Sequence, residues 1–455
     1  MPFGIHHNTR NRSPALVMNA DSHRPLGGKQ RNRTKRQAHP YKPEDHSNRE
    51  FHPLHLSSGK GPYDATPRDN LPPKVVHMSI TRRDFCSQAT AAFLSSRLSA
   101  QTPSAGSTVR PNVAVIDHDR ILAAADRYLP QPPAPITSLP ASDSPGSPHD
   151  YYSSPESFTA HRDALQSLGH IVPALTAAYV ITKDERYARQ AISHLRASFV
   201  SPDTALTPNL EYAQVVPPAE KGRPDGLIEG VPLAEIAQSV PFLQNSEALT
   251  QSDLDTITKW FVSYLDWLNN SRNAGLARDA RDHNASSWLL QAAACAKLNT
   301  KDDRALSSLR HLFKTSTVRA QISYEGTFIR ELSTPNPYRN SLFNLDLLAV
   351  ACDLLTTRFE TVWDYELQDG PSMRIAVAKH FPFIARRGTW PYRADSTYFN
   401  ELPLRRPVLL LAARAYSRPE YADLWKTLPP DTAIPELDRT LPIHQPVLWV
   451  TRPRP

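Results

Sequence analysis

Apolar residues recur at helical spacing along most of the chain beyond residue 116, and the alternation typical of strands is nearly absent. In the segment 252–268, for example, the apolar face consists of Leu254, Ile257, Phe261, Leu265 and Leu268. Ser252 and Asp253 open that segment with residues that favour a helix N-cap. The predicted helices are 117–128, 167–181, 184–199, 232–243, 252–268, 286–298, 302–315, 342–357, 370–384, 406–416 and 419–428. Polar and proline-rich connections join them, so we predict an all-α protein of many paired helices.

The N-terminal part of the chain has a different composition. Residues 1–77 are rich in Arg, Asn, His and Pro and lack apolar periodicity, so they cannot bury enough surface to offset their ordering entropy. We interpret them as a disordered basic extension or as a wrongly assigned translation start; a basic interaction tail is the alternative. A Pro- and Ser-rich lead-in over 101–145 separates this region from the helical domain, which we place at 146–455.

A short segment after the extension resembles an export signal. Met78 is followed by the twin arginines Arg82 and Arg83, an apolar run at 89–94, and small residues at 98–100 where a peptidase could cleave. This order is similar to a Tat signal peptide over 78–100. We therefore expect a bacterial protein that is exported to the periplasm or secreted.

Export is expected to depend on the twin arginines and not on the extension. Replacing Arg82 and Arg83 by Lys should leave the protein in the cytoplasmic fraction, because the Tat pathway reads this pair. Deleting residues 1–77 is the matched control and should leave export intact. Cell fractionation measures both, and unchanged export of the double Lys variant would remove the Tat interpretation.

The charge of the chain is divided unevenly between these regions. The formal net charge is +7, but residues 1–78 hold 13 Lys and Arg against 6 Asp and Glu, whereas residues 101–455 carry 36 basic and 38 acidic side chains. The helical domain therefore has no basic signal for nucleic acid. No run of about 18 apolar residues indicates a membrane span. The His residues of the domain are scattered without helical ligand spacing, so we expect neither a metal nor another cofactor.

The segment 281–288 joins a polar loop to an Ala-rich helix. His283 and Asn284 stand where that helix begins, and helix N-termini attract anions such as carboxylates. Both side chains are therefore candidates for binding an acidic ligand. The alternative is that Asn284 only caps the helix while His283 is solvated.

A second cluster lies between residues 326 and 346. It brings Arg330, Tyr338, Arg339 and Asn340 close to the start of the next apolar helix. A tyrosine can act as general acid or base if neighbouring cations lower its pKa. The alternative is a helix cap with surface arginines. Because both clusters are polar loops that precede apolar helices, we predict that His283 and Tyr338 face one cleft.

Two further features suit sugar chemistry. Tyr212 and Gln214 lie in a predicted loop, where a ring face and an amide could contact sugar hydroxyls, although Tyr212 could equally pack against a helix. Glu229 and Glu331 are the carboxylates that a glycoside hydrolase would use.

Taken in order, these segments resemble the alginate lyase family of polysaccharide lyases over about 145–450. The matching motifs are Tyr212-Ala213-Gln214, Gly226 to Gly230, Trp260-Phe261, Trp267-Leu268, the His283 loop, Ser341-Leu342-Phe343-Asn344-Leu345, Thr389-Trp390-Pro391-Tyr392, Pro419-Glu420-Tyr421 and Gln445-Pro446-Val447-Leu448-Trp449. The resemblance implies an incomplete (α/α) toroid of helical hairpins with a cleft for an acidic polysaccharide. We expect the protein to be a monomer.

The resemblance also implies β-elimination without a metal. The C5 proton of a uronic acid is removed, O4 leaves, and a C4=C5 double bond forms at the new end. His283 and Asn284 are then expected to neutralise the carboxylate with help from Arg339, while Tyr338 carries the proton. Substrate-binding residues would be Tyr212, Gln214, Trp288, Arg330 and Asn340.

Several positions depart from the family pattern. In one register the family His and Asn are exchanged at His283 and Asn284, and in another Asp282 replaces an Asn. The family Tyr falls on Asn340, so that either Tyr338 has taken its role or the proton carrier is lost. A family Arg falls on Thr334, where Arg330 or Arg339 could substitute. A non-catalytic polysaccharide-binding relative and a toroidal glycoside hydrolase therefore remain alternatives.

Overall fold

The computed structural model describes residues 109–453. The predicted extension, the Tat-like segment and residues 101–108 of the lead-in lie outside the described residues. Within the described part, no strand forms, and the only ladder contacts are isolated bridges such as the one between Tyr152 and Tyr212. The prediction of an all-α protein is confirmed.

Five helices form an inner layer in which each packs against the next along the chain. These are α4 (Ala160–Thr182), α6 (Pro232–Leu243), α9 (His283–Leu298), α13 (Pro337–Leu355) and α15 (Pro407–Tyr416). Each is followed by an outer helix that returns along the layer: α5 (Glu185–Phe199), α7 (Gln251–Asn270), α10 (Arg304–Leu312), α14 (Met373–Ala385) and α16 (Pro419–Thr427). The fold is thus an incomplete (α/α) toroid of helical hairpins.

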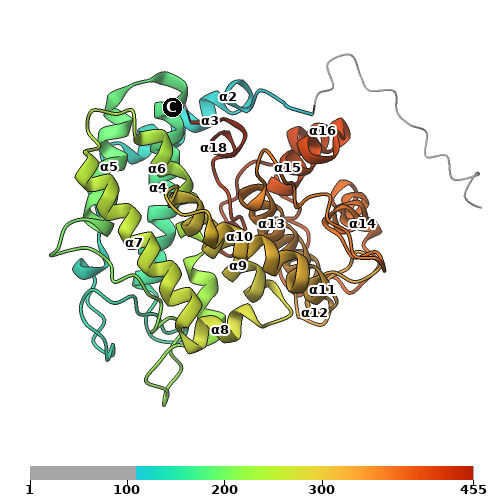
Figure 1. The fold of residues 1–455 in the computed structure, drawn as a ribbon, viewed down its shortest axis with the longest axis horizontal. Coiled ribbons are helices and arrows are strands. Elements are labelled where there is room, and N and C mark those ends of the chain that lie inside the picture. Colours follow the sequence, from blue (N-terminus) through green and yellow to red (C-terminus); the bar gives the residue numbers. More distant parts are fainter. Residues whose placement is uncertain (1–108, 454–455) are drawn as a thin grey trace, which may run out of the picture. The chain divides into compact units, whose positions relative to one another are not determined.

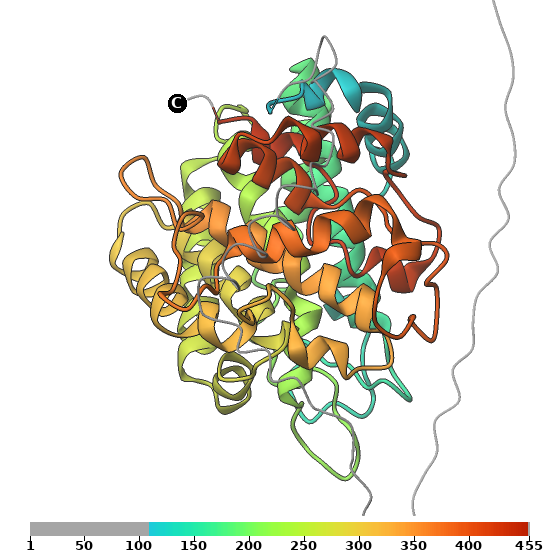
Figure 2. The same ribbon diagram turned by 90° about the vertical axis from the view of Figure 1, so that its right-hand side faces the viewer.

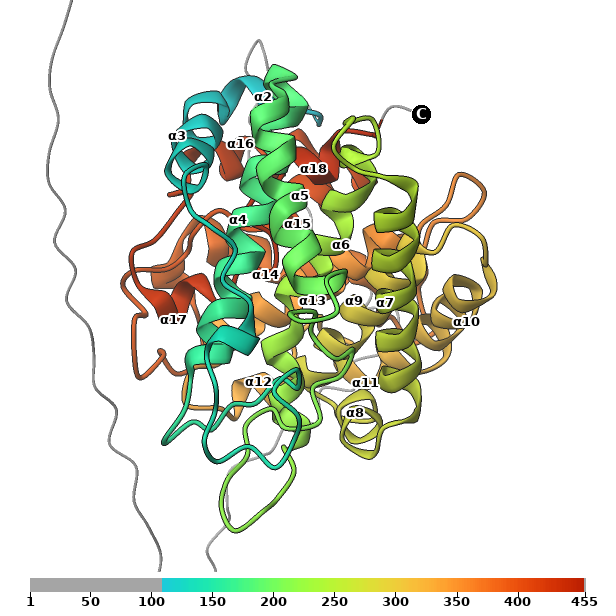
Figure 3. The ribbon, with the colours of Figure 1, turned by 90° about the vertical axis from the view of Figure 1, so that its left-hand side faces the viewer.

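Short elements connect the hairpins and close their ends. They are α2 (Val113–Ile116), α3 (His118–Tyr128), η1 (Ile136–Ser138), η2 (Pro224–Gly230), α8 (Arg272–Arg278), η3 (Phe313–Thr317), α11 (Val318–Gln321), α12 (Ile329–Leu332), η4 (Arg387–Thr389), α17 (Pro435–Asp438) and α18 (Val447–Val450). In Figure 1, α4 to α7 lie on one side of the central α9 and α13, and α14 to α16 lie on the other. Figure 2 faces the C-terminal half, and Figure 3 faces α4 and α5.

The inner helices are buried on nearly all sides. In α9, 14 of the 16 residues are buried, and in α13, 17 of the 19. Small residues such as Ala and the free cysteines Cys295 and Cys352 allow this close approach. The outer helices bury one stripe only, so α5 and α10 show the amphipathic pattern expected of a surface helix.

Most helix starts differ from the sequence prediction by one to seven residues, and the largest shift is that of α4, which begins at Ala160 and not at 167. Two of the other differences have a clear local cause. α7 begins after Thr250 and not at Ser252, because Thr250 and Asp253 cap each other's backbone N–H groups in a capping box. α13 begins at Pro337, five residues before the predicted start at 342. Proline is favoured at the first helical position, because the backbone N–H that it lacks would have no intrahelical partner there. The earlier start of α13 decides where the candidate site residues point.

One described helix, α4, has the length and apolarity that crossing a bilayer would need. Most of its apolar stretch is buried among other helices of the domain, as expected of a core helix.

Candidate active site

The inner helices run in the same direction, so their N-terminal ends gather on one rim. A cavity of about 260 Å³, here called the His283 cavity, lies on this rim between α4, α6, α9 and α13. Its charged and polar lining residues are Arg162, Gln166, Gln214, Glu229, Glu235, His283, Arg339, Asn340, Glu436, Arg439 and His444. Helix N-termini carry partial positive charge, and cationic side chains add to it. The helix N-termini and the three arginines supply contacts for an anionic ligand, and Glu229, Glu235 and Glu436 line the same cavity.

His283 is held at the rim by a buried carboxylate. Asp282 caps α9, accepting from the Asn284 N–H at 3.0 Å, and His283 follows as the first helical residue. Glu331, fully buried, accepts the His283 backbone N–H at 2.6 Å. Both of its oxygens lie 3.1 Å from His283 Nδ1. The side chain of His283 is 21% exposed, so the rest of the ring faces the cavity.

The Glu331 contact sets both the tautomer and the basicity of His283. With Nδ1–H donated to the carboxylate, the Nε2 lone pair of the neutral ring is left available. Burial alone would lower the pKa of His283, but the hydrogen bond and charge of Glu331 outweigh it and raise the pKa above the usual value. The pair is thus arranged as a base with an orienting acid behind it.

Arg339 and Asn340 reach the same cavity from the first turn of α13. The Arg339 guanidinium pairs with Glu436 at 2.6 Å, and its side chain is only 9% exposed. Asp395 accepts the backbone N–H groups of Tyr338 and Arg339 at 2.7 and 2.9 Å and thereby anchors the helix start. Asn340 donates to the Thr334 hydroxyl at 3.1 Å.

Gln214 lines the cavity from a strained turn, with φ of 55°. Its amide nitrogen donates to Glu229 at 3.2 Å, and its oxygen accepts from Arg223. Glu229 also accepts from Tyr151 at 2.7 Å and Ser153 at 2.5 Å. These donors fix the Glu229 carboxylate as part of the cavity wall.

Tyr338 does not face the cavity, and the prediction that it shares a cleft with His283 is wrong. Because α13 starts at Pro337, Tyr338 falls on the same helical face as Leu342 and Leu345 and is fully buried. Its hydroxyl donates to the Phe383 carbonyl at 3.0 Å. Burial raises the Tyr338 pKa far above the usual value. The residue belongs to the core and cannot carry protons for a substrate.

Four other predicted residues lie outside the cavity lining. Trp288 is a core residue whose indole N–H donates to the Leu268 carbonyl at 3.0 Å, so its predicted contact with substrate is wrong. Asn284 is buried behind the rim, with its amide donating to Asp225 at 3.1 Å. Arg330 is exposed on α12, and Tyr212 is half-buried beside its bridge to residue 152.

Several cavity residues escaped the sequence analysis. Arg162 and Glu235 lie in the first turns of α4 and α6, whereas Arg439 and His444 come from a C-terminal segment without a distinctive motif. Only the toroidal closure brings these segments together, so no local spacing could indicate them.

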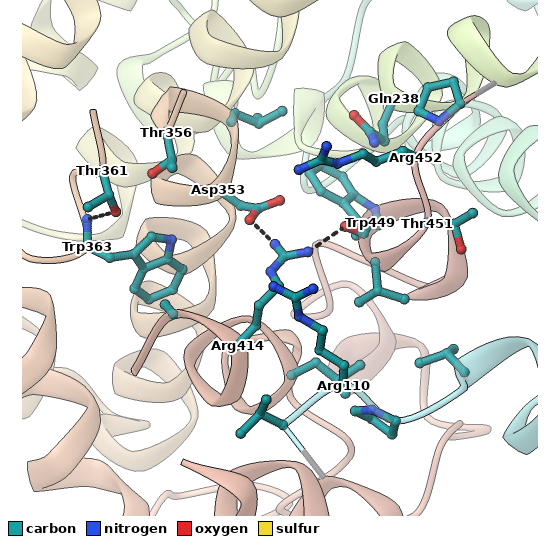
Figure 4. Close-up of a pocket in the computed structure, with 18 of the residues that line it drawn as sticks. Arg110, Gln238, Asp353, Thr356, Thr361, Trp363, Arg414, Trp449, Thr451 and Arg452 are labelled. Atoms are coloured by element: carbon teal, nitrogen blue, oxygen red, sulfur yellow. Dashed lines mark hydrogen bonds and ion pairs between the residues drawn. The ribbon is translucent and has the colours of Figure 1, made fainter. Parts of the chain in front are cut away.

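A larger cavity of about 1090 Å³ lies at the opposite, C-terminal ends of α6, α9, α13 and α15. In Figure 4, the Arg414 side chain lies between Asp353 and the backbone of Trp449. It forms an ion pair with the Asp353 carboxylate and donates to the Trp449 carbonyl. Among the residues that the structure describes, no histidine lines this cavity, and Asp353 is already paired with Arg414. Groups suited to proton transfer are thus concentrated at the other end, in the His283 cavity.

Comparison with known proteins identifies the family and a similar fold. No curated protein matches the chain in sequence. An alginate lyase structure from Bacteroides ovatus is 21% identical, with a TM-score of 0.65, covering 75% of this chain and 94% of that one. Alginate lyase A1-III from Sphingomonas species A1 is 12% identical, with a TM-score of 0.48, covering 76% and 96%. The sequence model of the alginate lyase family matches residues 101–390, more than half of the chain, and this protein therefore belongs to the alginate lyase family.

Proposed function

We propose that this protein is a polysaccharide lyase that cleaves an acidic, uronic acid-containing polysaccharide such as alginate by β-elimination. One observation carries the proposal: His283, backed by the buried Glu331, opens onto the same cavity as Arg339 and Asn340. This combination joins a base to donors for a carboxylate, which is what abstraction of the C5 proton requires.

In the proposed reaction, His283 Nε2 takes the proton from C5. The electrons of the broken C5–H bond form the C4=C5 double bond as the C4–O4 bond breaks. The proton then passes from His283 to the departing O4, and the imidazole ring of His283 is neutral again. Arg339, Asn340 and the helix N-termini on the rim stabilise the added negative charge on the C5 carboxylate. His283 thus replaces Tyr338 as the proton carrier.

The direct test is to incubate the purified chain with alginate, with polymers of mannuronate, guluronate or glucuronate, and with a neutral glucan as control. A lyase produces near-ultraviolet absorbance from the new C4=C5 double bond with the acidic polymers only. New reducing ends without that absorbance would instead indicate a hydrolase and overturn the proposal.

A non-catalytic binding relative is the second candidate, because the family resemblance places the family Tyr on Asn340. An amide does not titrate in the working range, so Asn340 can hold a carboxylate but cannot move its proton. Binding of alginate without any unsaturated product would favour this candidate.

Removing the charge behind His283 is expected to shift the pH dependence of activity. In Glu331→Gln the pKa of His283 should fall, because the contact that raises it is lost while the burial that lowers it remains. A base works in its neutral form, so activity rises with pH through that pKa. The rising limb of the kcat/KM profile should therefore move to lower pH, with a lower plateau from the weaker, less well-oriented base.

The control for this variant is Glu229→Gln, which changes a carboxylate of the same cavity that does not contact His283 in the described structure. Glu229→Gln should leave the pH of the rising limb of the kcat/KM profile unchanged. A limb that moves to higher pH in Glu331→Gln, or does not move, would contradict His283 as the base.

A further inference from the structure

Three ionisable side chains converge beside the His283 cavity without taking part in the proposed reaction. His170 comes from α4, Asp438 ends α17, and His444 lies in the segment that leads to α18. Their nearest nitrogen and oxygen atoms all lie within 4.8 Å of one another. His170 Nε2 is 3.0 Å from Asp438 Oδ2, His444 Nε2 is 3.4 Å from Asp438 Oδ1, and the two Nε2 atoms are 3.1 Å apart.

Hydrogen bonds alone cannot satisfy this cluster. A histidine ring nitrogen has either one proton or one lone pair. His170 Nε2 nevertheless faces Asp438, His444 Nε2 and, at 3.3 Å, the Gln166 amide. If both Nε2 atoms donate to Asp438, two protonated ring nitrogens lie 3.1 Å apart with no lone pair between them. If either nitrogen is unprotonated, it gives up its hydrogen bond to the carboxylate.

A cation between the three atoms removes this conflict. A tetrahedral ion with bonds of about 2.0–2.1 Å to His and Asp holds its ligand atoms roughly 3.3 Å apart, close to the separations in this cluster. Two histidines and one carboxylate are a common ligand set for zinc, with the fourth position left for water or an amide oxygen. We propose that His170, Asp438 and His444 form a site for a divalent transition metal such as Zn²⁺.

The surroundings supply the outer contacts that such a site needs. The other ring nitrogen of His444, Nδ1, lies 3.5 Å from Glu235, a fully buried carboxylate. This carboxylate orients the ring so that Nε2 points to the cluster. Glu235 is itself fixed by the backbone N–H groups of His444 and Gln445, each at 2.8 Å. Together Asp438 and Glu235 balance the charge of a divalent ion.

The position of the cluster determines how an ion reaches it and what its binding does to the fold. The ligand side chains are 17–24% exposed and line a cavity of about 820 Å³, so an ion can enter. Binding would tie α4 to the C-terminal segment that carries Glu436 and Arg439, two residues of the His283 cavity wall. The ion would thereby stabilise the toroid closure next to the proposed active site, independently of the elimination chemistry.

The test uses the full chain, stripped with a chelator and titrated with Zn²⁺ alone. We expect about one ion per chain and a higher Tm on binding, because an ion that binds only the folded state stabilises it. Co²⁺ in place of Zn²⁺ should give the visible absorption of a tetrahedral site. Asp438→Asn and His170→Gln should each weaken Zn²⁺ affinity by on the order of 100-fold or more.

His118→Gln is the matched control, since His118 also contacts an aspartate, Asp119 at 2.9 Å, but on the exposed surface and not in the lining of the cavity that holds the cluster. It should bind Zn²⁺ as the wild type does. The proposal is overturned if the wild-type chain binds no stoichiometric Zn²⁺, or if the Asp438 and His170 variants bind it as tightly as the control. The Co²⁺ spectrum of the wild type decides the question even if a variant fails to fold.

Discussion

Replacing His283 by Gln is expected to lower the rate of elimination by a factor on the order of 10²–10⁴, the usual contribution of general acid–base catalysis. The reason is geometric: His283 has a buried carboxylate on one ring nitrogen, and the other side of its ring faces the cavity. The amide of Gln cannot accept and return a proton in the working pH range. Initial rates from the absorbance of the unsaturated product measure the effect.

Polymer binding by His283→Gln should change much less than kcat, since Arg339 and Asn340 remain in place. Tyr338→Phe provides the matched control. It removes only the hydroxyl that donates to the Phe383 carbonyl, so it should cost about 1 kcal/mol of stability and leave kcat within a few-fold of the wild type. If Tyr338→Phe loses the rate and His283→Gln keeps it, the assignment of the proton carrier is wrong.

The helical architecture could be predicted from the sequence because each layer of the toroid has its own pattern. The outer α5 and α10 show one apolar stripe, whereas the inner α9 and α13 contain the continuous apolar runs 292–296 and 347–352 and are buried almost all round. Hydrophobic spacing therefore located them without any tertiary information. Their ends depended on single capping contacts, such as Thr250 with Asp253, for which Ser252 was an equally plausible alternative by residue type.

The candidate site was predictable only in part, and the start of α13 explains why. A tyrosine and an arginine side by side in a loop could both face a ligand. In a helix, successive residues point about 100° apart, so Arg339 lines the cavity while Tyr338 enters the core. The one-turn extension from residue 342 back to Pro337 thus changed which residue could act on a substrate.

Other site residues depend on closure of the toroid. His444 meets Glu235 and His170 only because the C-terminal segment returns to α4 and α6. The sequence indicates Glu331 as a possible hydrolase acid, but its contact with His283 requires the short α12 to pack under the start of α9. Contacts between segments so distant in sequence have no periodic signature, so only the three-dimensional structure identifies them.

Breaking a buried ion pair that holds the toroid closed is expected to cause the largest loss of stability. Arg406 and Asp346 are both essentially inaccessible to solvent and pair directly. Asp346 also accepts the Val408 N–H at 3.2 Å, and Arg406 donates to the Thr440 carbonyl at 3.2 Å. The pair therefore joins α13, the start of α15 and the segment between Asp438 and His444. Arg406→Leu should lower the free energy of unfolding by about 3–5 kcal/mol, because it leaves a buried carboxylate without its counter-charge.

The pH dependence and a double variant separate this cause from a simple packing defect. Burial raises the pKa of Asp346 to about 6 even with Arg406 present, and removing Arg406 should raise it further. A carboxyl whose pKa is higher in the folded than in the unfolded state loses stability as pH rises. The deficit of Arg406→Leu, measured by urea unfolding, should therefore be larger above the wild-type pKa of about 6 than below it. Adding Asp346→Leu removes the uncompensated charge and should recover part of the lost free energy of unfolding. If the loss in Arg406→Leu is instead independent of pH, and the losses of the two single variants add in the double variant, packing and not charge dominates at this position.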